Sequence, residues 1–301
     1  MRIFVTGATG CVGGAVLDAL VRGGHQVTGL VRNTERAAQV AARGGAPVIG
    51  DLADPGSYRD LAPQHDAVVH AALESSPRGV ELERNALEVM LAALSEPGMG
   101  PRAFVYTSGV WVIGPTNQPA TEETPIKPTA YSVWRPAHEQ MVLGAATGDL
   151  RTMVVRPGIV YGGSRGIVAD LLRDALKGLV RVIGSGENRW AAIYERDLGE
   201  LYVRLLSRPD ASGLYHATDE ADERVNDIVE AIAAAAPQRP DIRRMPLDEA
   251  RAKLGAYAEA LALDQVVRSP RARALGWAPV RRSITGNASR LFEEWRGGRQ
   301  A

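Results

Sequence analysis

The stretch Thr6-Gly7-Ala8-Thr9-Gly10-Cys11-Val12-Gly13 decides the fold, because its three glycines stand at three-residue spacing between an apolar run and a helical pattern. Ile3 to Val5 predict a strand before it, and Val12 to Arg22 predict an amphipathic helix after it. The first glycine permits a tight turn, the second lets the main chain approach a pyrophosphate, and the third lets helix and strand pack closely. Backbone N–H groups and the positive end of the helix dipole would face the phosphates. We therefore predict a dinucleotide-binding unit over residues 1 to 72.

The residues after the next strand indicate which coenzyme is bound. Val27 to Val31 are followed by Arg32 and Asn33, where an NAD-specific protein usually carries an acid for the adenosine ribose. Guanidinium forms charge-assisted bonds to phosphate, so Arg32 suits the 2′-phosphate of NADP(H), and Arg36 adds a second charge. The alternative is a solvated loop arginine, since 32 of the 35 basic residues are arginine. We predict NADP(H) in preference to NAD(H). The first predicted contacts are Gly7, Thr9, Gly10, Cys11, Val12, Gly13, Arg32, Asn33 and Arg36.

Short apolar runs alternate with helical segments through the first half of the chain, which is typical of parallel strands joined by helical crossovers. The six runs are Ile3 to Val5, Val27 to Val31, Pro47 to Ile49, Ala67 to His70, Phe104 to Tyr106 and Met153 to Val155. They predict an α/β fold with a doubly wound parallel sheet of the Rossmann type. After Pro157-Gly158, glycine and proline interrupt the alternation of apolar runs and helical segments. This predicts a smaller, mostly helical C-terminal substrate lobe. We place the dinucleotide-binding domain at 1–160 and the lobe at 161–301, and expect residues near 191–217 to rejoin the sheet.

Composition excludes several classes of protein. The 301 residues are 45% hydrophobic, and 35 basic residues balance 35 acidic ones, so no net field attracts nucleic acid or an anionic membrane. No apolar run approaches the ~18 residues of a membrane span, and Met1-Arg2 leads directly into the first strand without room for a signal peptide. The single cysteine, Cys11, suits a reducing compartment. We expect a cytoplasmic protein, and no metal, because the five histidines lack metal-ligand spacing.

Five segments together resemble the extended short-chain dehydrogenase/reductase family, which includes sugar-nucleotide epimerases, dehydratases and flavonoid-type ketone reductases. They are Thr6 to Gly13, Gly50-Asp51-Leu52, Val68-Val69-His70-Ala71-Ala72, Phe104 to Ser108 and Arg156 to Gly162. The resemblance runs on to Ser269 to Trp277, before the last helix. It implies that Asp51 and Leu52 border the adenine, that Ala71 and Ala72 line the coenzyme cleft, and that Pro157, Gly158 and Val160 lie beside the nicotinamide. It also implies a homodimer that pairs through helices near 78–95 and 132–147.

The family's catalytic pattern is altered in this chain. The resemblance implies that Tyr131 is the acid or base on the substrate oxygen, but the position four residues later, usually lysine, holds Arg135. An arginine can bind a ribose and favour a phenolate, but it cannot lose its proton. Gly109 takes the usual Ser or Thr position, so Ser108 or the adjacent Thr107 would supply the hydroxyl. We predict Tyr131, Arg135 and Ser108 as catalytic residues, with Thr107, Tyr131 and Arg135 also at the coenzyme; the alternative is that Tyr131 and Arg135 only bind substrate or stabilise structure.

Pro136 leaves the local geometry open. If Ser132 caps the helix, the proline falls in the first turn and Tyr131 and Arg135 lie about one turn apart. If the helix begins at Pro136, that geometry is lost.

On the substrate side, the resemblance points to the loop Gly184 to Trp190. Asn188, Arg189, Trp190 and Arg165 are the predicted substrate residues, because arginine recognises phosphate or carboxylate and tryptophan stacks on rings. Each has a structural alternative, namely a loop-turn asparagine, surface arginines and a core tryptophan. Gly162-Gly163-Ser164-Arg165-Gly166 also matches the Gly-x-Ser-x-Gly motif of serine hydrolases, with His216 downstream.

These patterns favour an NADP(H)-dependent oxidoreductase or epimerase that acts on a carbonyl or secondary alcohol carbon of a small molecule. Two other readings stay open. One is a catalytically weak NADP(H)-binding sensor or regulatory protein, and the other is epimerisation or dehydration without net redox change. Fold alone does not choose among them.

Overall fold

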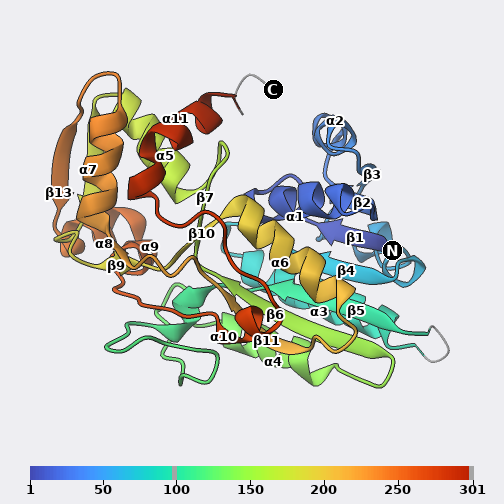
Figure 1. Cartoon of the computed structure of the whole chain (residues 1–301). Coiled ribbons are helices and arrows are strands. Elements are labelled where there is room, and N and C mark those ends of the chain that lie inside the picture. Colours follow the sequence, from blue (N-terminus) through green and yellow to red (C-terminus); the bar gives the residue numbers. More distant parts are fainter. Residues whose placement is uncertain (97–99, 298–301) are drawn as a thin grey trace.

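A computed structural model describes residues 1–96 and 100–297, and its centre is a parallel sheet of seven strands in the order β11-β6-β5-β4-β1-β2-β3 (Figure 1). All six predicted strands lie in this sheet, and a seventh comes from the second half of the chain. The strands are β1 (Arg2–Thr6), β2 (Gln26–Val31), β3 (Ala46–Ile49), β4 (Ala67–His70), β5 (Arg102–Thr107), β6 (Leu150–Pro157) and β11 (Gly213–Ala217). The strand order reverses between β1 and β4, and ligands of such sheets bind at the carboxyl ends beside this point. The predicted α/β, doubly wound fold is confirmed.

Helices cover both faces of the sheet because neighbouring side chains of a strand point to opposite faces. Val5 packs with α1 (Cys11–Arg22), α2 (Thr34–Ala42) and α6 (Glu195–Ser207) on one face. Phe4 packs with α3 (Gly79–Leu94) and α4 (Arg135–Gly144) on the other. Three short 3-10 helices flank this part of the chain: η1 (Pro55–Ser57), η2 (Ala62–Gln64) and η3 (Val110–Ile113).

The C-terminal lobe lies beside the carboxyl ends of the strands (Figure 1). Its core is formed by α5 (Ile167–Leu176), α7 (Val225–Ala235) and α11 (Ala288–Gly297). Three short strand pairs accompany them: β7 (Ile159–Tyr161) with β10 (Ala192–Tyr194), β9 (Arg189–Trp190) with β12 (Glu223–Arg224), and β8 (Leu179–Ile183) with β13 (Asp241–Met245). The remaining elements are α8 (Leu247–Leu254), α9 (Tyr257–Leu261), α10 (Pro270–Ala274) and η4 (Thr285–Asn287).

The helix expected near 132–147 is shorter than predicted, since α4 begins at Arg135 and ends at Gly144. Pro136 lies in its first turn, where the missing N–H costs no intrahelical bond. Ser132 does not cap the helix: its N–H bonds the Thr129 carbonyl, and the Arg135 N–H bonds the Ser132 carbonyl, in turns that precede α4. Neither expected geometry is therefore found, and Tyr131 lies in a turn just ahead of the helix.

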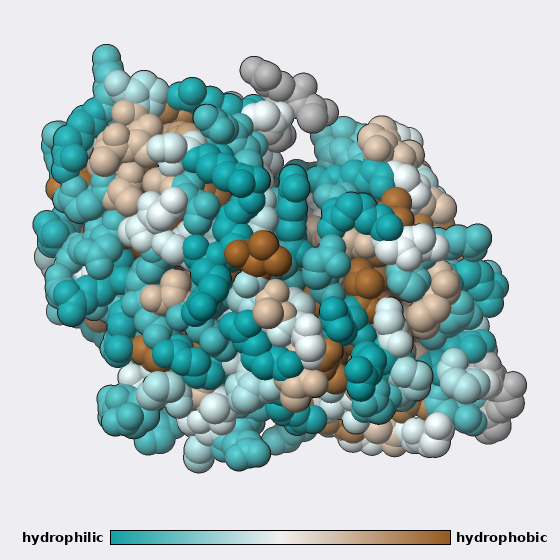
Figure 2. All heavy atoms as spheres, viewed as in Figure 1, coloured by the Kyte–Doolittle hydropathy of each residue, from teal (hydrophilic) through white to brown (hydrophobic). Residues whose placement is uncertain are grey.

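On the face drawn in Figure 2, the most hydrophobic residues form small separate areas among polar ones, and a group of mildly apolar residues lies at the upper left. Within residues 1–96 and 100–297 no helix combines the length and the apolar character that crossing a bilayer requires.

Candidate functional site

The glycine-rich turn is shaped by close backbone contacts. Gly7 has a φ of +71°, and a Cβ there would lie 2.6 Å from the Ala71 carbonyl oxygen. A Cβ on Gly13 would lie 2.1 Å from the Gly7 carbonyl oxygen. Only glycine fits these two positions. Helix α1 begins directly after Gly10 with no side-chain cap and no acid in its first turn, so its first N–H groups stay available for an anion.

The end of β2 presents an exposed arginine, Arg32, whose charge helps to lower the pKa of the Glu74 carboxyl after the larger effects of Ser76 and Arg78. The Arg32 side chain makes no hydrogen bond or ion pair with the described part of the chain. The Asn33 side chain accepts the Arg36 N–H at 2.9 Å and thereby caps α2. The Arg36 guanidinium donates to Gln39 at 3.3 Å. Of these three predicted coenzyme residues, Arg32 is the one whose side chain makes no hydrogen bond in the described ranges, and its contact with a phosphate stays a prediction.

The other predicted coenzyme residues follow the carboxyl ends of neighbouring strands. Asp51 and Leu52 follow β3, and the Asp51 carboxylate accepts the Ala53 N–H at 2.9 Å. Ala71 and Ala72 follow β4 and abut Gly7. Pro157 ends β6, Gly158 follows it, and Val160 lies in β7. Because the strands are parallel, all of these positions meet at one edge of the sheet.

Tyr131 belongs to a group of three rings from distant parts of the chain, here called the aromatic cluster (Trp111, Tyr131, Tyr257). The Tyr131 ring centroid lies 5.5 Å from Trp111 and 5.3 Å from Tyr257, and Trp111 lies 6.1 Å from Tyr257. Tyr131 is 36% exposed, and its hydroxyl makes no hydrogen bond within residues 1–96 and 100–297. The phenol is therefore open to a ligand.

Arg135 points toward the end of β5. Its guanidinium donates to the Tyr106 hydroxyl and the Thr107 carbonyl, both at 3.3 Å, and lies 4.4 Å from the Trp134 ring centroid. Burial raises the pKa of the Tyr106 phenol, and the Arg135 charge opposes that rise. A permanent cation therefore stands at the carboxyl end of β5, four residues after Tyr131.

Both candidate hydroxyls already have protein partners. Ser108 is buried and donates to the Glu139 carboxylate at 2.5 Å, and Glu139 pairs with Arg156 at 2.5 and 2.9 Å. The Thr107 hydroxyl bonds the Tyr202 hydroxyl at 2.7 Å. Sequence reasoning did not assign roles to Glu139, Arg156 and Tyr202, because their contacts join elements that are distant in the chain. Which hydroxyl serves catalysis stays a prediction.

The predicted substrate loop is bonded to the segment after α9. Asn188 donates to the Leu261 and Leu263 carbonyls at 3.1 and 3.2 Å, and the Trp190 indole donates to the Leu261 carbonyl at 3.0 Å. Arg189 pairs with Asp264 at 2.7 Å. These three side chains thus hold α9 and its Tyr257, and their contact with substrate stays a prediction.

Arg165 lies instead beside the glycine-rich turn. Its carbonyl oxygen is 3.7 Å from the Cys11 sulfur, and Arg165, Thr9, Gly10 and Cys11 line one cavity of about 640 Å³. Burial raises the pKa of the Cys11 thiol to about 12, so the thiol stays protonated at neutral pH. Glu195, at the start of α6, lines the same cavity.

We expect the Glu195 carboxyl to make the stability of the fold depend on pH. Burial, with Asp18 and Glu294 nearby, raises the pKa of its carboxyl from 4.5 to about 7. A raised acid pKa stabilises the fold below the unfolded value, and the contribution is lost as the pH rises through the folded value. Between pH 5 and 8 we expect the free energy of unfolding of the wild type to fall by up to about 3 kcal/mol relative to Glu195→Gln. Urea unfolding of both proteins at each pH measures it, and a pH-independent difference would contradict the prediction.

The serine-hydrolase motif does not form a catalytic pair. Ser164 is exposed, whereas His216 is fully buried with its Nδ1 3.1 Å from the Arg268 carbonyl. No hydrogen bond joins the two side chains in the described ranges. The hydrolase alternative therefore has no support in the geometry.

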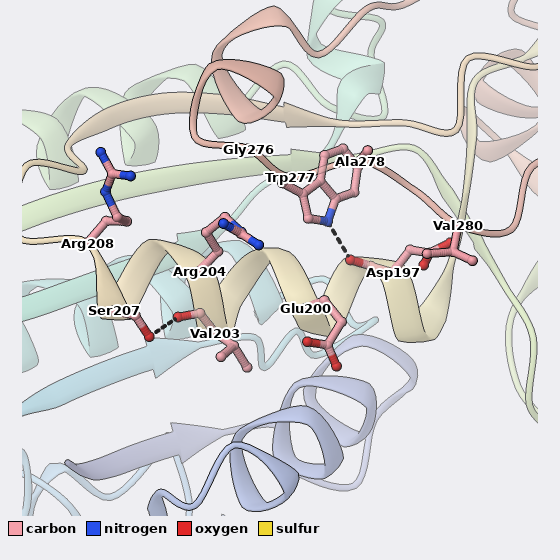
Figure 3. Close-up of a pocket in the computed structure, with 10 residues that line it drawn as sticks. All are labelled: Asp197, Glu200, Val203, Arg204, Ser207, Arg208, Gly276, Trp277, Ala278 and Val280. Atoms are coloured by element: carbon pink, nitrogen blue, oxygen red, sulfur yellow. Dashed lines mark hydrogen bonds between the residues drawn. The ribbon is translucent and has the colours of Figure 1, made fainter.

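A second hollow of about 510 Å³ lies on α6 (Figure 3). The Trp277 indole, on the segment after α10, donates to the Asp197 carbonyl at 2.8 Å and closes one side. None of the predicted site residues is among the described residues that line it. The predicted site residues therefore lie outside this hollow.

Comparison with known proteins identifies the family. The model of the NAD dependent epimerase/dehydratase family matches residues 3–218. The chain belongs to this family. A Schizosaccharomyces pombe protein of uncharacterized function is 31% identical over 94% of this chain and 97% of its own length.

Two other relatives of this epimerase/dehydratase chain carry more specific names. A ketoreductase of 4-hydroxy-2-methyl-3-oxo-4-farnesyl-3,4-dihydroquinoline-1-oxide from Stigmatella aurantiaca is 28% identical over 84% of this chain and 78% of its own. The crystal structure of human epimerase family protein SDR39U1 with NADPH has a TM-score of 0.81 and 22% identity, covering 97% of this chain and 99% of that one. At that identity the structural likeness shows the fold.

Proposed function

We propose that the protein is an NADP(H)-dependent oxidoreductase or epimerase that acts on a carbonyl or secondary alcohol carbon of a small molecule. The observation that carries the proposal is the open Tyr131 phenol in the turn before α4, with Arg135 at the carboxyl end of β5. The names of the Stigmatella ketoreductase and of human SDR39U1 with NADPH support it.

Three groups of residues would hold NADP(H). The N–H groups that open α1 would hold the diphosphate, where the missing Cβ atoms of Gly7 and Gly13 leave room for the tight turn. Arg32 would bind the 2′-phosphate, and Arg135 would bind a ribose hydroxyl. When bound, NADPH supplies hydride to a carbonyl carbon.

Tyr131 would donate its proton to the substrate oxygen as that oxygen gains charge. The positive charge of Arg135 would favour the resulting phenolate but would not relay the proton, because guanidinium keeps its own. The Ser108 hydroxyl donates to Glu139 and the Thr107 hydroxyl bonds Tyr202, so either hydroxyl would have to exchange that partner in order to polarise the substrate oxygen.

A second candidate function is a catalytically weak NADP(H)-binding sensor or regulatory protein. The bonded state of Ser108 and Thr107 and the arginine at position 135 favour it. An NADPH-oxidation and thermal-shift screen over aldehydes, ketones and sugar nucleotides separates the two. Turnover supports the enzyme, whereas strong stabilisation by NADPH with no turnover on any class supports the sensor.

Coenzyme preference is tested at Arg32. Charge-assisted bonds contribute about 1.5–3 kcal/mol, so Arg32→Asp should weaken NADPH binding by roughly 10- to 100-fold while NADH binding changes little. Titration of both coenzymes into wild type and variant measures the effect, and Arg243→Asp, at an exposed position of β13 in the C-terminal lobe, serves as a control for general loss of positive charge. Equal binding of NADPH and NADH by the wild type would refute the preference.

We also propose a homodimer that pairs through α3 and α4. Val80 at the start of α3 is 37% exposed, and Val133 just before α4 is 61% exposed, which leaves apolar side chains for a partner to cover. Sedimentation or light scattering of the purified chain tests this proposal.

A further inference from the structure

We propose that the aromatic cluster (Trp111, Tyr131, Tyr257) is the substrate-binding surface, and that it selects an uncharged substrate with a flat ring beside the reacting carbon. This inference rests on the proposed function, since it places the substrate against the Tyr131 phenol.

The cluster joins both parts of the protein. Trp111 lies in η3 after β5, Tyr131 in the turn before α4, and Tyr257 opens α9 in the C-terminal lobe. The rings meet edge-on or tilted, with interplanar angles of 75°, 65° and 46°. All three side chains keep part of their surface exposed. Such edges and faces bind another flat ring in the same offset or edge-to-face manner.

Hydrogen bonds hold the main chain around the three rings in place. The Ser132 hydroxyl donates to the Trp111 carbonyl at 3.0 Å, which ties the turn that carries Tyr131 to η3. Asn188 and Trp190 both donate to the Leu261 carbonyl at the end of α9. A surface held on two sides is preorganised, and binding to it costs little ordering of side chains.

The nearby charges disfavour an anionic substrate. Arg189, the arginine expected to recognise phosphate, is neutralised by Asp264 through hydrogen bonds of 2.7 and 2.9 Å. Arg135 is turned toward Tyr106 and Thr107. The acid whose charge acts on Tyr257 is Asp170, which pairs with Arg173 at 2.8 Å. Of these arginines only Arg135 keeps a charge that no acid pairs with in the described ranges, and the proposed function assigns that charge to the coenzyme ribose.

Tyr257 also offers a hydroxyl in place of the bonded Ser108 and Thr107. Its oxygen makes no hydrogen bond within the described ranges, and burial, with the charges of Tyr131 and Asp170, raises the pKa of its phenol to about 12. It therefore stays protonated and can donate to an oxygen that lies near Tyr131.

Binding of alcohols to the NADPH-saturated full chain tests the inference without turnover, because the reduced coenzyme cannot accept hydride from an alcohol. Calorimetry with 1-phenylethanol, 2-butanol and UDP-glucose should show the tightest binding for 1-phenylethanol. Trp111→Ala should weaken binding of 1-phenylethanol about tenfold, and Trp111→Phe, which keeps a ring, should weaken it much less. Tyr257→Phe should weaken binding through the hydroxyl alone, and Tyr257→Ala should weaken it further. NADPH affinity should be unchanged in all four variants, which verifies that they fold.

Two results would overturn the inference: tighter binding of UDP-glucose than of 1-phenylethanol, or unchanged binding of 1-phenylethanol by Trp111→Ala. Failure of the proposed function looks different. In that case 1-phenylethanol binds and responds to the variants, but neither it nor acetophenone is turned over with the coenzyme.

Discussion

Tyr131→Phe is expected to lower the rate of carbonyl reduction by roughly 10²- to 10⁴-fold, the range that a positioned proton donor contributes. The substitution removes the Tyr131 hydroxyl, which makes no hydrogen bond in the described ranges, and it keeps the ring that packs on Trp111 and Tyr257. Single-turnover kinetics with NADPH and a substrate found in the screen measure the chemical step directly. The loss should appear in kcat, because the phenol bonds the oxygen most strongly as charge develops.

NADPH affinity and the midpoint of thermal unfolding serve as controls for Tyr131→Phe. Both should match the wild type, since neither depends on the free hydroxyl. Turnover equal to that of the wild type would remove Tyr131 from the proton-donor role and leave it as a binding residue of the aromatic cluster.

Glu139→Ala is expected to destabilise the protein by about 3–5 kcal/mol, because it leaves the Arg156 guanidinium charged and unpaired in the interior. Both side chains of the ion pair are about 5% exposed. The Ser108 hydroxyl would lose its acceptor as well. Urea unfolding measures the change in the free energy of unfolding. It is obtained from the shift in the midpoint urea concentration, provided that the slope of the free energy against urea concentration is unchanged.

A double variant distinguishes the effect of the unpaired buried charge from the effect of lost side-chain packing. Glu139→Leu combined with Arg156→Met replaces the pair by apolar side chains and should recover most of the lost stability. If the double variant is no more stable than Glu139→Ala, the ion pair is not the source of the destabilisation.

The sheet was predictable because its signals are local. Each predicted apolar run is three to five residues long, and Gly7 and Gly13 of the first turn are required because a Cβ there would lie as close as 2.1 Å to the main chain. Parallel strands then bring their carboxyl ends together, whatever the details of the connecting helices. The length of α4 was not predictable in this way, since Pro136 allowed two starting points and the structure uses a third, Arg135.

The substrate side was harder to predict because it depends on contacts between distant residues. Tyr257 meets Tyr131 across 126 positions of the chain, and α9 is a helix of five residues with little periodicity to recognise. The sequence also does not reveal which polar side chains are buried. Ser108 stays a predicted catalytic residue, but its hydrogen bond to Glu139, 31 positions away, cannot be predicted from the sequence.

The hydrogen bonds from Asn188 and Trp190 to α9 do not depend on the side chains of that helix. Asn188 and Trp190 both bond the main-chain carbonyl of residue 261, and every amino acid supplies that carbonyl. The helix would therefore keep its position when the side chains at 257 and 261 are exchanged. A library of substitutions at position 257 could thus alter which ketones are accepted while the coenzyme turn, Tyr131 and Arg135 keep their places.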